Sequence, residues 1–217
     1  MPDASLPVVF VTSLFVGFSG ALSPGPLLVL NIRESMRLGF RAGPLISLGH
    51  ALLELLVVVC LYLGLSSYFR GGVAIALIGF LGGAFLLWMS WGLLKQPSRG
   101  APSETTITGT KDAPRFGPIV NGALVSLANP FWTLWWATLG VTYLVWAQEL
   151  GVVGLVAFYV GHILADFSWY SLVSFGIASG RKVMSDMTYR LIMLLCGLFL
   201  LILGVYFLIS GVQFLFE

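Results

Sequence analysis

The sequence predicts an all-α integral membrane protein with six transmembrane helices, arranged as two inverted three-helix repeats. Composition, the spacing of apolar stretches and an internal repetition predict this fold. Of the 217 residues, 58% are hydrophobic and only 9% are charged, and the mean hydropathy is +0.97. Soluble domains carry about 25% charged residues. This chain therefore has too few polar side chains to cover a water-soluble fold of its size.

Six apolar stretches are long enough to cross a bilayer, whose hydrocarbon core requires roughly 20 residues of helix. The first stretch is not expected to be a signal peptide, because residues 1–16 contain no Lys or Arg and a signal peptide begins with a positive segment. The expected spans are 7–32, 44–67, 72–94, 117–147, 151–179 and 191–216.

Basic residues are concentrated in the three connections that share one side of a six-span protein. Ten of the eleven Lys and Arg residues fall there, and only Arg70 falls on the other side. Positive charge marks cytoplasmic loops, so we expect a multi-pass protein of the cytoplasmic (inner) membrane with both termini outside. The net charge of +2 follows from this bias, and it therefore gives no indication of a nucleic-acid partner.

One hydrophilic linker divides the chain nearly in half. Its sequence is KQPSRGAPSETTITGTKDAPRF, and such richness in Pro, Gly, Ser and Thr is typical of a flexible connection. We expect residues 1–94 to form the first three-helix repeat, residues 95–116 a flexible cytoplasmic linker, and residues 117–217 the second repeat.

Matching motifs in the two halves indicate a duplication. Residues 49–54 read GHALLE and residues 161–166 read GHILAD, and these two segments hold the only two histidines of the chain. Residues 83–87 (GAFLL) and 197–201 (GLFLL) match at a similar separation. Because each half has an odd number of spans, the second copy enters the membrane from the opposite side, which predicts an inverted repeat.

Prolines predict that the first and fourth helices are broken near mid-membrane. Proline inside a helix removes a hydrogen bond and clashes with the preceding turn, although a simple kink is the alternative. The start of a new half-helix offers free N–H groups and a positive dipole end, which favour a carboxylate or another anion. The candidate substrate-binding residues are therefore Ser23, Pro24, Gly25, Pro26, Asn129 and Pro130.

Glu54 and Asp166 are the acids expected well inside the hydrocarbon, where a charge costs about 2.5–3.5 kcal/mol on insertion scales. His50 and His162 each precede an acid by four residues, so each pair shares one helix face. The functional interpretation makes these four residues the proton-coupling groups or a site for a substrate cation. A structural hydrogen bond between neutral groups is the alternative. Two histidines and two acids also suit a metal, but the leading interpretation assigns no metal site and no cofactor.

Aromatic side chains follow the predicted break in the fourth span. Trp132 and Trp136 lie four residues apart, so they share a helix face and could wall a pocket. Helix packing is nevertheless the role expected for them. Trp169 and Tyr170, which follow Asp166, have the same two interpretations.

These features resemble the LysE-type amino-acid exporter family (LysE/RhtB). The resemblance rests on SPGP at 23–26 followed by an apolar run and an Arg-rich turn, on GAFLLxxxWG at 83–92, and on Asn129-Pro130. It spans about residues 15–211, and it implies an inner-membrane exporter of amino acids and related solutes that is driven by the proton gradient. By this resemblance, Pro24, Gly25, Pro26, Asn129 and Pro130 occupy the motif positions of the family.

Two features depart from the family pattern. Phe131 stands where a Lys often follows the Asn-Pro pair, and the two Gly-His-x-x-x-acid motifs are absent from the pattern of most members. Both departures bear on the substrate and indicate a distinct subgroup.

The sequence therefore predicts a secondary transporter, not an enzyme, that exports a small amino acid or a related zwitterion or anion by proton antiport. Its expected partners are the solute, protons and the lipid bilayer, and self-association is left open. One alternative is a metal or ion permease that uses the two His–acid pairs. The other is a membrane thiol-redox protein, which needs cysteines at equivalent repeat positions, whereas Cys60 and Cys196 lie in the second and sixth spans.

Overall fold

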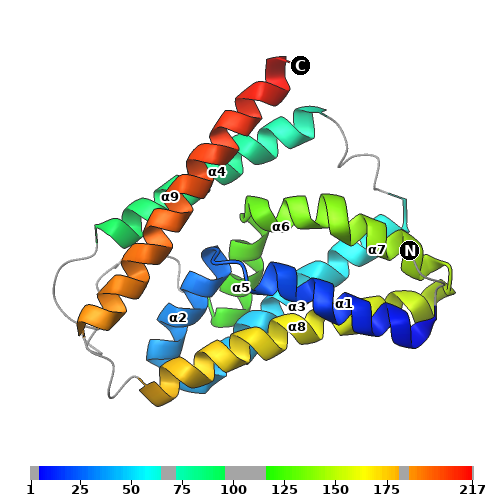
Figure 1. The fold of residues 1–217 in the computed structure, drawn as a ribbon, viewed down its shortest axis with the longest axis horizontal. Coiled ribbons are helices and arrows are strands. Elements are labelled where there is room, and N and C mark those ends of the chain that lie inside the picture. The colour runs from blue at the N-terminus through cyan, green and yellow to red at the C-terminus, as the bar shows by residue number, and fades with distance from the viewer. Residues whose placement is uncertain (1–4, 65–71, 96–115, 181–185, 217) are drawn as a thin grey trace.

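The computed structural model describes residues 5–64, 72–95, 116–180 and 186–216, and these parts of the chain are helical with short turns (Figure 1). Most of the predicted linker, residues 96–115, lies outside the described residues. The first half contains α1 (Leu6–Ala21), α2 (Pro26–Leu38), the 3-10 turn η1 (Gly39–Arg41), α3 (Ala42–Tyr62) and α4 (Gly72–Leu94). The second half contains α5 (Pro118–Leu127), α6 (Pro130–Trp135), the π-helical turn η3 (Trp136–Gly140), α7 (Val141–Gln148), α8 (Gly151–Gly180) and α9 (Asp186–Phe216).

Three described stretches are long and apolar enough to cross a membrane: Pro26–Tyr62, Gly151–Gly180 and Arg190–Ile209. The first of these joins α2 to α3 through a turn at Gly39, whose φ of +67° suits glycine. Shorter apolar helices are Leu6–Ala21, Gly83–Leu94 and Pro118–Leu127. The helical membrane class is therefore supported, whereas the six-span inverted repeat stays a prediction.

The helices are interrupted at both places where prolines predict a break. α1 ends at Ala21, and α2 begins at Pro26 after an extended Gly25. α5 ends at Leu127, and α6 begins at Pro130 after Asn129. In both cases proline takes the first helical position, where its missing N–H removes no intrahelical hydrogen bond. The depth of these breaks in a bilayer stays a prediction.

Four helices form a bundle in which α1 packs along α8, α5 packs along α3, and α3 contacts α8 (Figure 1). The glycine that begins each Gly-His-x-x-x-acid motif permits a close helix contact, of α8 with α1 in one case and of α3 with α5 in the other. Gly161 of α8 lies against the backbone of Phe10 in α1, and Gly49 of α3 lies against the backbone of Ile119 in α5. A side chain at either glycine would collide with that backbone, so these contacts hold α3 and α8 at the centre of the bundle.

A second unit, beside the bundle, consists of α4 packed along α9 (Figure 1). Gly83 of α4 and Gly204 of α9 bring the two backbones close together, and Ser90 Oγ donates to the carbonyl of Gly197 at 2.8 Å. A buried apolar cluster joins this pair to α2, and its members are Val29, Ile32, Leu86, Leu93, Met193, Cys196, Leu200 and Phe207.

Candidate functional site

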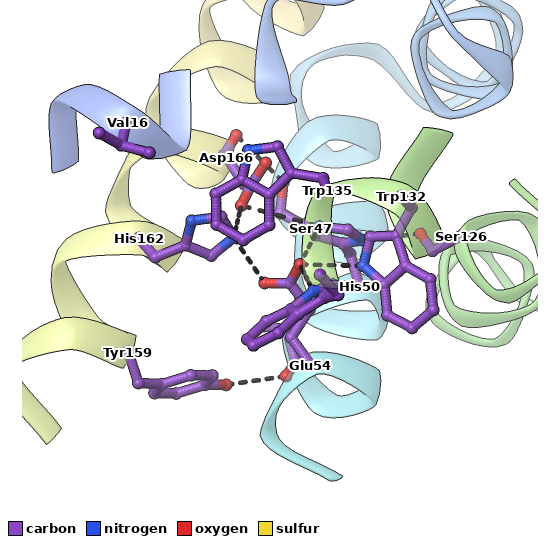
Figure 2. Close-up of polar contacts among 12 residues, drawn as sticks. Val16, Ser47, His50, Glu54, Ser126, Trp132, Trp135, Tyr159, His162 and Asp166 are labelled. Atoms are coloured by element: carbon purple, nitrogen blue, oxygen red, sulfur yellow. Dashed lines mark hydrogen bonds and ion pairs between the residues drawn. The ribbon is translucent and has the colours of Figure 1, made fainter. Parts of the chain in front are cut away.

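The two Gly-His-x-x-x-acid motifs meet where α3 contacts α8. His50 and Glu54 of α3 and His162 and Asp166 of α8 form one cluster, named here the His–acid quartet (Figure 2). Each of the four side chains belongs to a residue that is at most 5% exposed. Helical spacing predicts each pair separately, and the close packing of α3 against α8 brings the pairs together.

Ring nitrogens and carboxylate oxygens face each other within the quartet. His50 Nε2 lies 3.2 Å from Glu54 Oε1 and 3.7 Å from Asp166 Oδ2. His162 Nε2 lies 3.0 Å from Glu54 Oε2 and 3.7 Å from Asp166 Oδ2. Each imidazole therefore contacts the acid on its own helix and the acid on the opposite helix.

Two tryptophans bind Glu54. The indole N–H groups of Trp132 and Trp136 each donate to Glu54 Oε1 at 2.9 Å. We expected these residues to serve in packing, and the structure adds a hydrogen bond to that role. Trp136 begins the π-helical turn η3, and Gly140 leaves room for the Trp136 ring where a Cβ would collide. Single π-helical turns are frequent at functional sites.

Ser126 of α5 is a further site residue, one that the sequence analysis did not identify. Its Oγ lies 2.7 Å from His50 Nδ1 and also donates to the carbonyl of Gly122 at 2.7 Å. Because a hydroxyl has one proton and the carbonyl takes it, Ser126 accepts a hydrogen bond from the Nδ1–H of His50. Ser126 and His50 are 76 residues apart in the sequence and lie on different helices, so no local sequence pattern marks this contact.

His162 lacks the contact that orients His50. Within the described part of the chain, His162 Nδ1 has no hydrogen-bond partner, and His162 Nε2 has the ion-pair contacts to Glu54 and Asp166 given above. Gly17 of α1 lies beside its Nδ1, so that a Cβ on Gly17 would be 3.0 Å away. The two histidines therefore differ: a hydroxyl holds His50, whereas His162 rests against backbone and aromatic rings, including Trp135 at a centroid distance of 4.4 Å.

Buried polar atoms point into the quartet. Among the described residues, Glu54 Oε2, His162 Nε2 and Asp166 Oδ2 have no hydrogen-bond partner, although they face each other at the ion-pair distances given above. Most buried polar atoms in proteins are hydrogen-bonded, and the exceptions indicate strain, catalysis, or an unseen water or ion.

A small cavity connects the quartet to both helix breaks. Leu27, in the first turn of α2, and Asn129, which precedes α6, both line this cavity. Its volume is about 40 Å³, which is room for a few water molecules. Its aromatic wall consists of Phe131, Trp132, Trp135 and Tyr170.

The predicted substrate residues lie at the junction of the two breaks. Asn129 lines the cavity, and its Oδ1 accepts from the N–H of Phe131 at 3.1 Å. A Cβ on Gly25 would lie 3.6 Å from Asn129 Nδ2, so the two breaks adjoin. Pro26 and Pro130 are buried, whereas Ser23 is half-buried and Pro24 is exposed. Of the six predicted substrate residues, Asn129 lines the cavity in the described structure, and the other five do not: Ser23, Pro24, Gly25, Pro26 and Pro130.

A buried polar seam connects α2 to α8 beyond Tyr170, which lines the cavity. Asn31 Nδ2 donates to the carbonyl of Tyr170 at 3.0 Å, and Ser174 Oγ donates to Asn31 Oδ1 at 2.8 Å. The hydroxyls of Ser35 and Ser174 lie 2.7 Å apart. These contacts close the space between the two helices on the side of the Arg-rich turn that ends α2.

Comparison with known proteins gives one family and one curated relative. The family model described as LysE type translocator matches residues 18–211, a range that includes the quartet and both breaks. The relative is the "Uncharacterized membrane protein YahN" of Escherichia coli (strain K12), which is 29% identical over 188 residues. The aligned region covers 82% of this chain and 80% of the relative. No solved structure matches.

Proposed function

Because the chain belongs to the LysE type translocator family, we propose that it exports a small amino acid, or a related zwitterion or anion, in exchange for protons. Members of this family are transporters and not enzymes. The observation that carries the proposal is the cavity that joins the His–acid quartet to both helix breaks. A site of this kind offers acidic groups at one end and helix N-termini at the other.

The helix breaks form the end of the site that binds the substrate carboxylate. α2 begins at Pro26, so the free N–H groups of its first turn and its positive dipole end lie at the break. The amide nitrogen of Asn129 lies beside Gly25 and adds a donor there. We assign substrate binding to both breaks, with Ser23, Pro24, Gly25, Pro26, Asn129 and Pro130 as the contributing residues.

The quartet forms the opposite end of the site, which binds a proton or the ammonium group of the substrate. Glu54 is held by two indole N–H groups and faces both histidines. Asp166 Oδ2, by contrast, has no hydrogen bond among the described residues. We therefore propose that Glu54 keeps its hydrogen bonds during the transport cycle. Asp166 is the acid whose bound partner, a proton or the substrate ammonium group, changes during that cycle. His50 and His162 complete the proton-coupling group.

Movement of α2 against α8 is the proposed opening step. The cavity of about 40 Å³ has room only for a few water molecules, so a solute enters only after the site widens. The seam of Asn31, Ser35 and Ser174 is held by hydrogen bonds, and apolar side chains of α2 and α8 pack on either side of it. We place the seam on the cytoplasmic side of the inner membrane, with both termini outside, in agreement with the bias of basic residues.

A transport assay in proteoliposomes tests the proposal. Purified protein is reconstituted, and the uptake of labelled small amino acids is compared with and without a pH gradient across the membrane. The proposal predicts that at least one amino acid or related zwitterion is taken up faster when the gradient drives protons in the opposite direction. If no such solute moves under either condition, the assignment as an amino-acid exporter is wrong.

A further inference from the structure

We propose that the His–acid quartet binds one divalent transition-metal ion of the Zn²⁺ class, with His50, Glu54, His162 and Asp166 as its ligands. This inference goes beyond the proposed export function, and it does not depend on which solute is exported. Because metal ligands must be deprotonated, Zn²⁺ would compete with protons for the quartet and would block proton coupling while bound. It rests on the spacing of the four side chains, on the orientation of His50 and on the buried atoms without hydrogen bonds.

The distances between the ring nitrogens and the carboxylate oxygens of the quartet are close to those between neighbouring ligands of a tetrahedral site. Zn²⁺ binds imidazole nitrogen and carboxylate oxygen at about 2.0–2.2 Å, so that neighbouring tetrahedral ligands lie about 3.3–3.6 Å apart. The four nitrogen–oxygen separations in the quartet are 3.0, 3.2, 3.7 and 3.7 Å. The ligand atoms of His50, Glu54 and Asp166 lie within 4.8 Å of one another. His162 is not part of this close group, and it faces the other oxygen of Glu54, Oε2. Three ligands are therefore in place between α3 and α8, and His162 completes the set by rotating toward them.

His50 is oriented as metal-binding histidines usually are. Its Nδ1–H donates to Ser126 Oγ at 2.7 Å, which leaves Nε2 directed at the carboxylate oxygens. Histidine ligands almost always donate their other ring N–H to a carboxylate, a backbone carbonyl or a water, and this contact fixes the tautomer and the ring orientation. The Ser126 hydroxyl takes that place at His50. The hydroxyl of Ser126 is itself fixed by its bond to the carbonyl of Gly122 at 2.7 Å.

A metal ion would bind buried atoms that have ion-pair contacts with one another but no hydrogen bonds. Glu54 Oε2, His162 Nε2 and Asp166 Oδ2 are all in this state within the described structure. Their residues are at most 3% exposed. Buried charges in proteins are normally paired or coordinate a metal. A divalent cation would balance both carboxylates and contact both imidazoles at once.

The mixed ligand set determines the class of ion. Imidazole suits Zn²⁺ and its transition-metal neighbours, whereas Ca²⁺ and Mg²⁺ prefer six or more oxygen ligands. The quartet offers two nitrogens and two carboxylates. The Trp132 and Trp136 indoles donate to Glu54 Oε1, which leaves Oε2 as the Glu54 oxygen without a hydrogen bond in the described structure. Four ligands of this kind favour tetrahedral Zn²⁺.

Metal binding to the purified full-length protein tests the inference. The protein, carrying no polyhistidine tag, is placed in lipid nanodiscs and dialysed to equilibrium against Zn²⁺ without any amino acid. We expect one ion per chain, and Co²⁺ in its place should give the intense visible absorption of a tetrahedral site. The only two histidines of the chain are both in the quartet, so histidine coordination reports on this site alone.

Substitutions locate the ion. His162→Gln and Asp166→Asn should each weaken Zn²⁺ binding at least about a hundredfold, and Ser126→Ala, which removes only the partner of His50, about tenfold. Cys60→Ser and Glu34→Gln, which change a thiol and an acid outside the quartet, should bind as the wild type does. Unchanged affinity in both His162→Gln and Asp166→Asn would place the ion elsewhere and overturn the proposal. If a ligand variant fails to fold, Ser126→Ala and the Co²⁺ spectrum decide the question.

The result is separable from that of the transport assay. A protein that exports an amino acid but binds no Zn²⁺ contradicts the metal site and leaves the export function intact. A protein that binds Zn²⁺ through the quartet and moves no amino acid supports the site and contradicts the export function.

Discussion

At the scale of single residues, the two acids of the repeated motif occupy different surroundings. Glu54 accepts two indole N–H groups and faces both histidines, whereas Asp166 Oδ2 has no hydrogen bond among the described residues. Position in the motif and helical spacing predicted that both acids share a face with a histidine. The difference between them arises from Trp132 and Trp136, which belong to other elements, and so it could not be predicted from either motif.

Replacement of the acids by amides separates a coupling role from a structural one. We expect Glu54→Gln and Asp166→Asn each to leave a folded, inserted protein whose transport falls at least about tenfold or no longer responds to a pH gradient, because shape is kept while the titrating group is lost. Uptake into proteoliposomes measures this. If both amide variants transport at the wild-type rate with the wild-type pH dependence, the acids are structural. In that case Glu54→Leu or Asp166→Leu should misfold.

Loss of one indole donor should destabilise the site. Trp136→Phe keeps a ring but removes a hydrogen bond to a carboxylate, and bonds to charged groups contribute about 1.5–3 kcal/mol. We expect a lower midpoint of thermal unfolding in detergent and weaker transport. The matched control is Trp88→Phe, because Trp88 is 72% exposed on α4. Equal midpoints for the two variants would show that the hydrogen bond to Glu54 contributes no stability.

At the scale of helices, the sequence predicted where elements break but not which elements meet. Pro26 and Pro130 fix the starts of α2 and α6, because proline acts locally on its own turn. The contact between α3 and α8 depends instead on packing between segments more than 100 residues apart. Gly49 and Gly161 carry a signal for close approach, but they do not indicate that α5 and α1 are the partners.

A methyl group at Gly161 should separate α1 from α8. The Cβ of Gly161→Ala would collide with the backbone of Phe10, whereas a Cβ on Gly176 of the same helix meets nothing within 4 Å. We expect Gly161→Ala to destabilise the protein by about 1–3 kcal/mol, the range for overpacking. Gly176→Ala should be neutral or slightly stabilising, because alanine favours helix. Thermal unfolding of the two variants in detergent measures the difference, and equal midpoints would contradict the close contact.

A disulfide across the polar seam should stop transport reversibly. The hydroxyls of Ser35 and Ser174 lie 2.7 Å apart, so cysteines at these positions can reach each other. In a background with Cys60→Ser and Cys196→Ser, we expect oxidised Ser35→Cys/Ser174→Cys to lose transport and to regain it on reduction. Ser35→Cys alone is the control, because it cannot form the crosslink. Full transport by the crosslinked protein would show that α2 and α8 do not separate during the cycle.

At the scale of the whole molecule, composition predicted the membrane class. The resemblance carried by SPGP, GAFLLxxxWG and Asn129-Pro130 indicated the family, which the match over residues 18–211 confirms. The four members of the quartet stood out in the sequence as candidate residues, because acids and histidines are rare in apolar helices, and their role in coupling stays a prediction. The single quartet, its indole donors and the partner hydroxyl of Ser126 required the three-dimensional arrangement. In that arrangement α4 and α9 pair beside the bundle and take no part in the cavity within the described structure.

Proton movement driven by a solute gradient tests the central claim most directly. Proteoliposomes are loaded with the exported solute and a pH-sensitive dye, then diluted into solute-free buffer of the same pH. The account predicts that the interior acidifies as the solute leaves, because protons enter in exchange, and that Asp166→Asn abolishes the signal. Solute efflux without a pH change, or with an alkaline change, would contradict proton antiport.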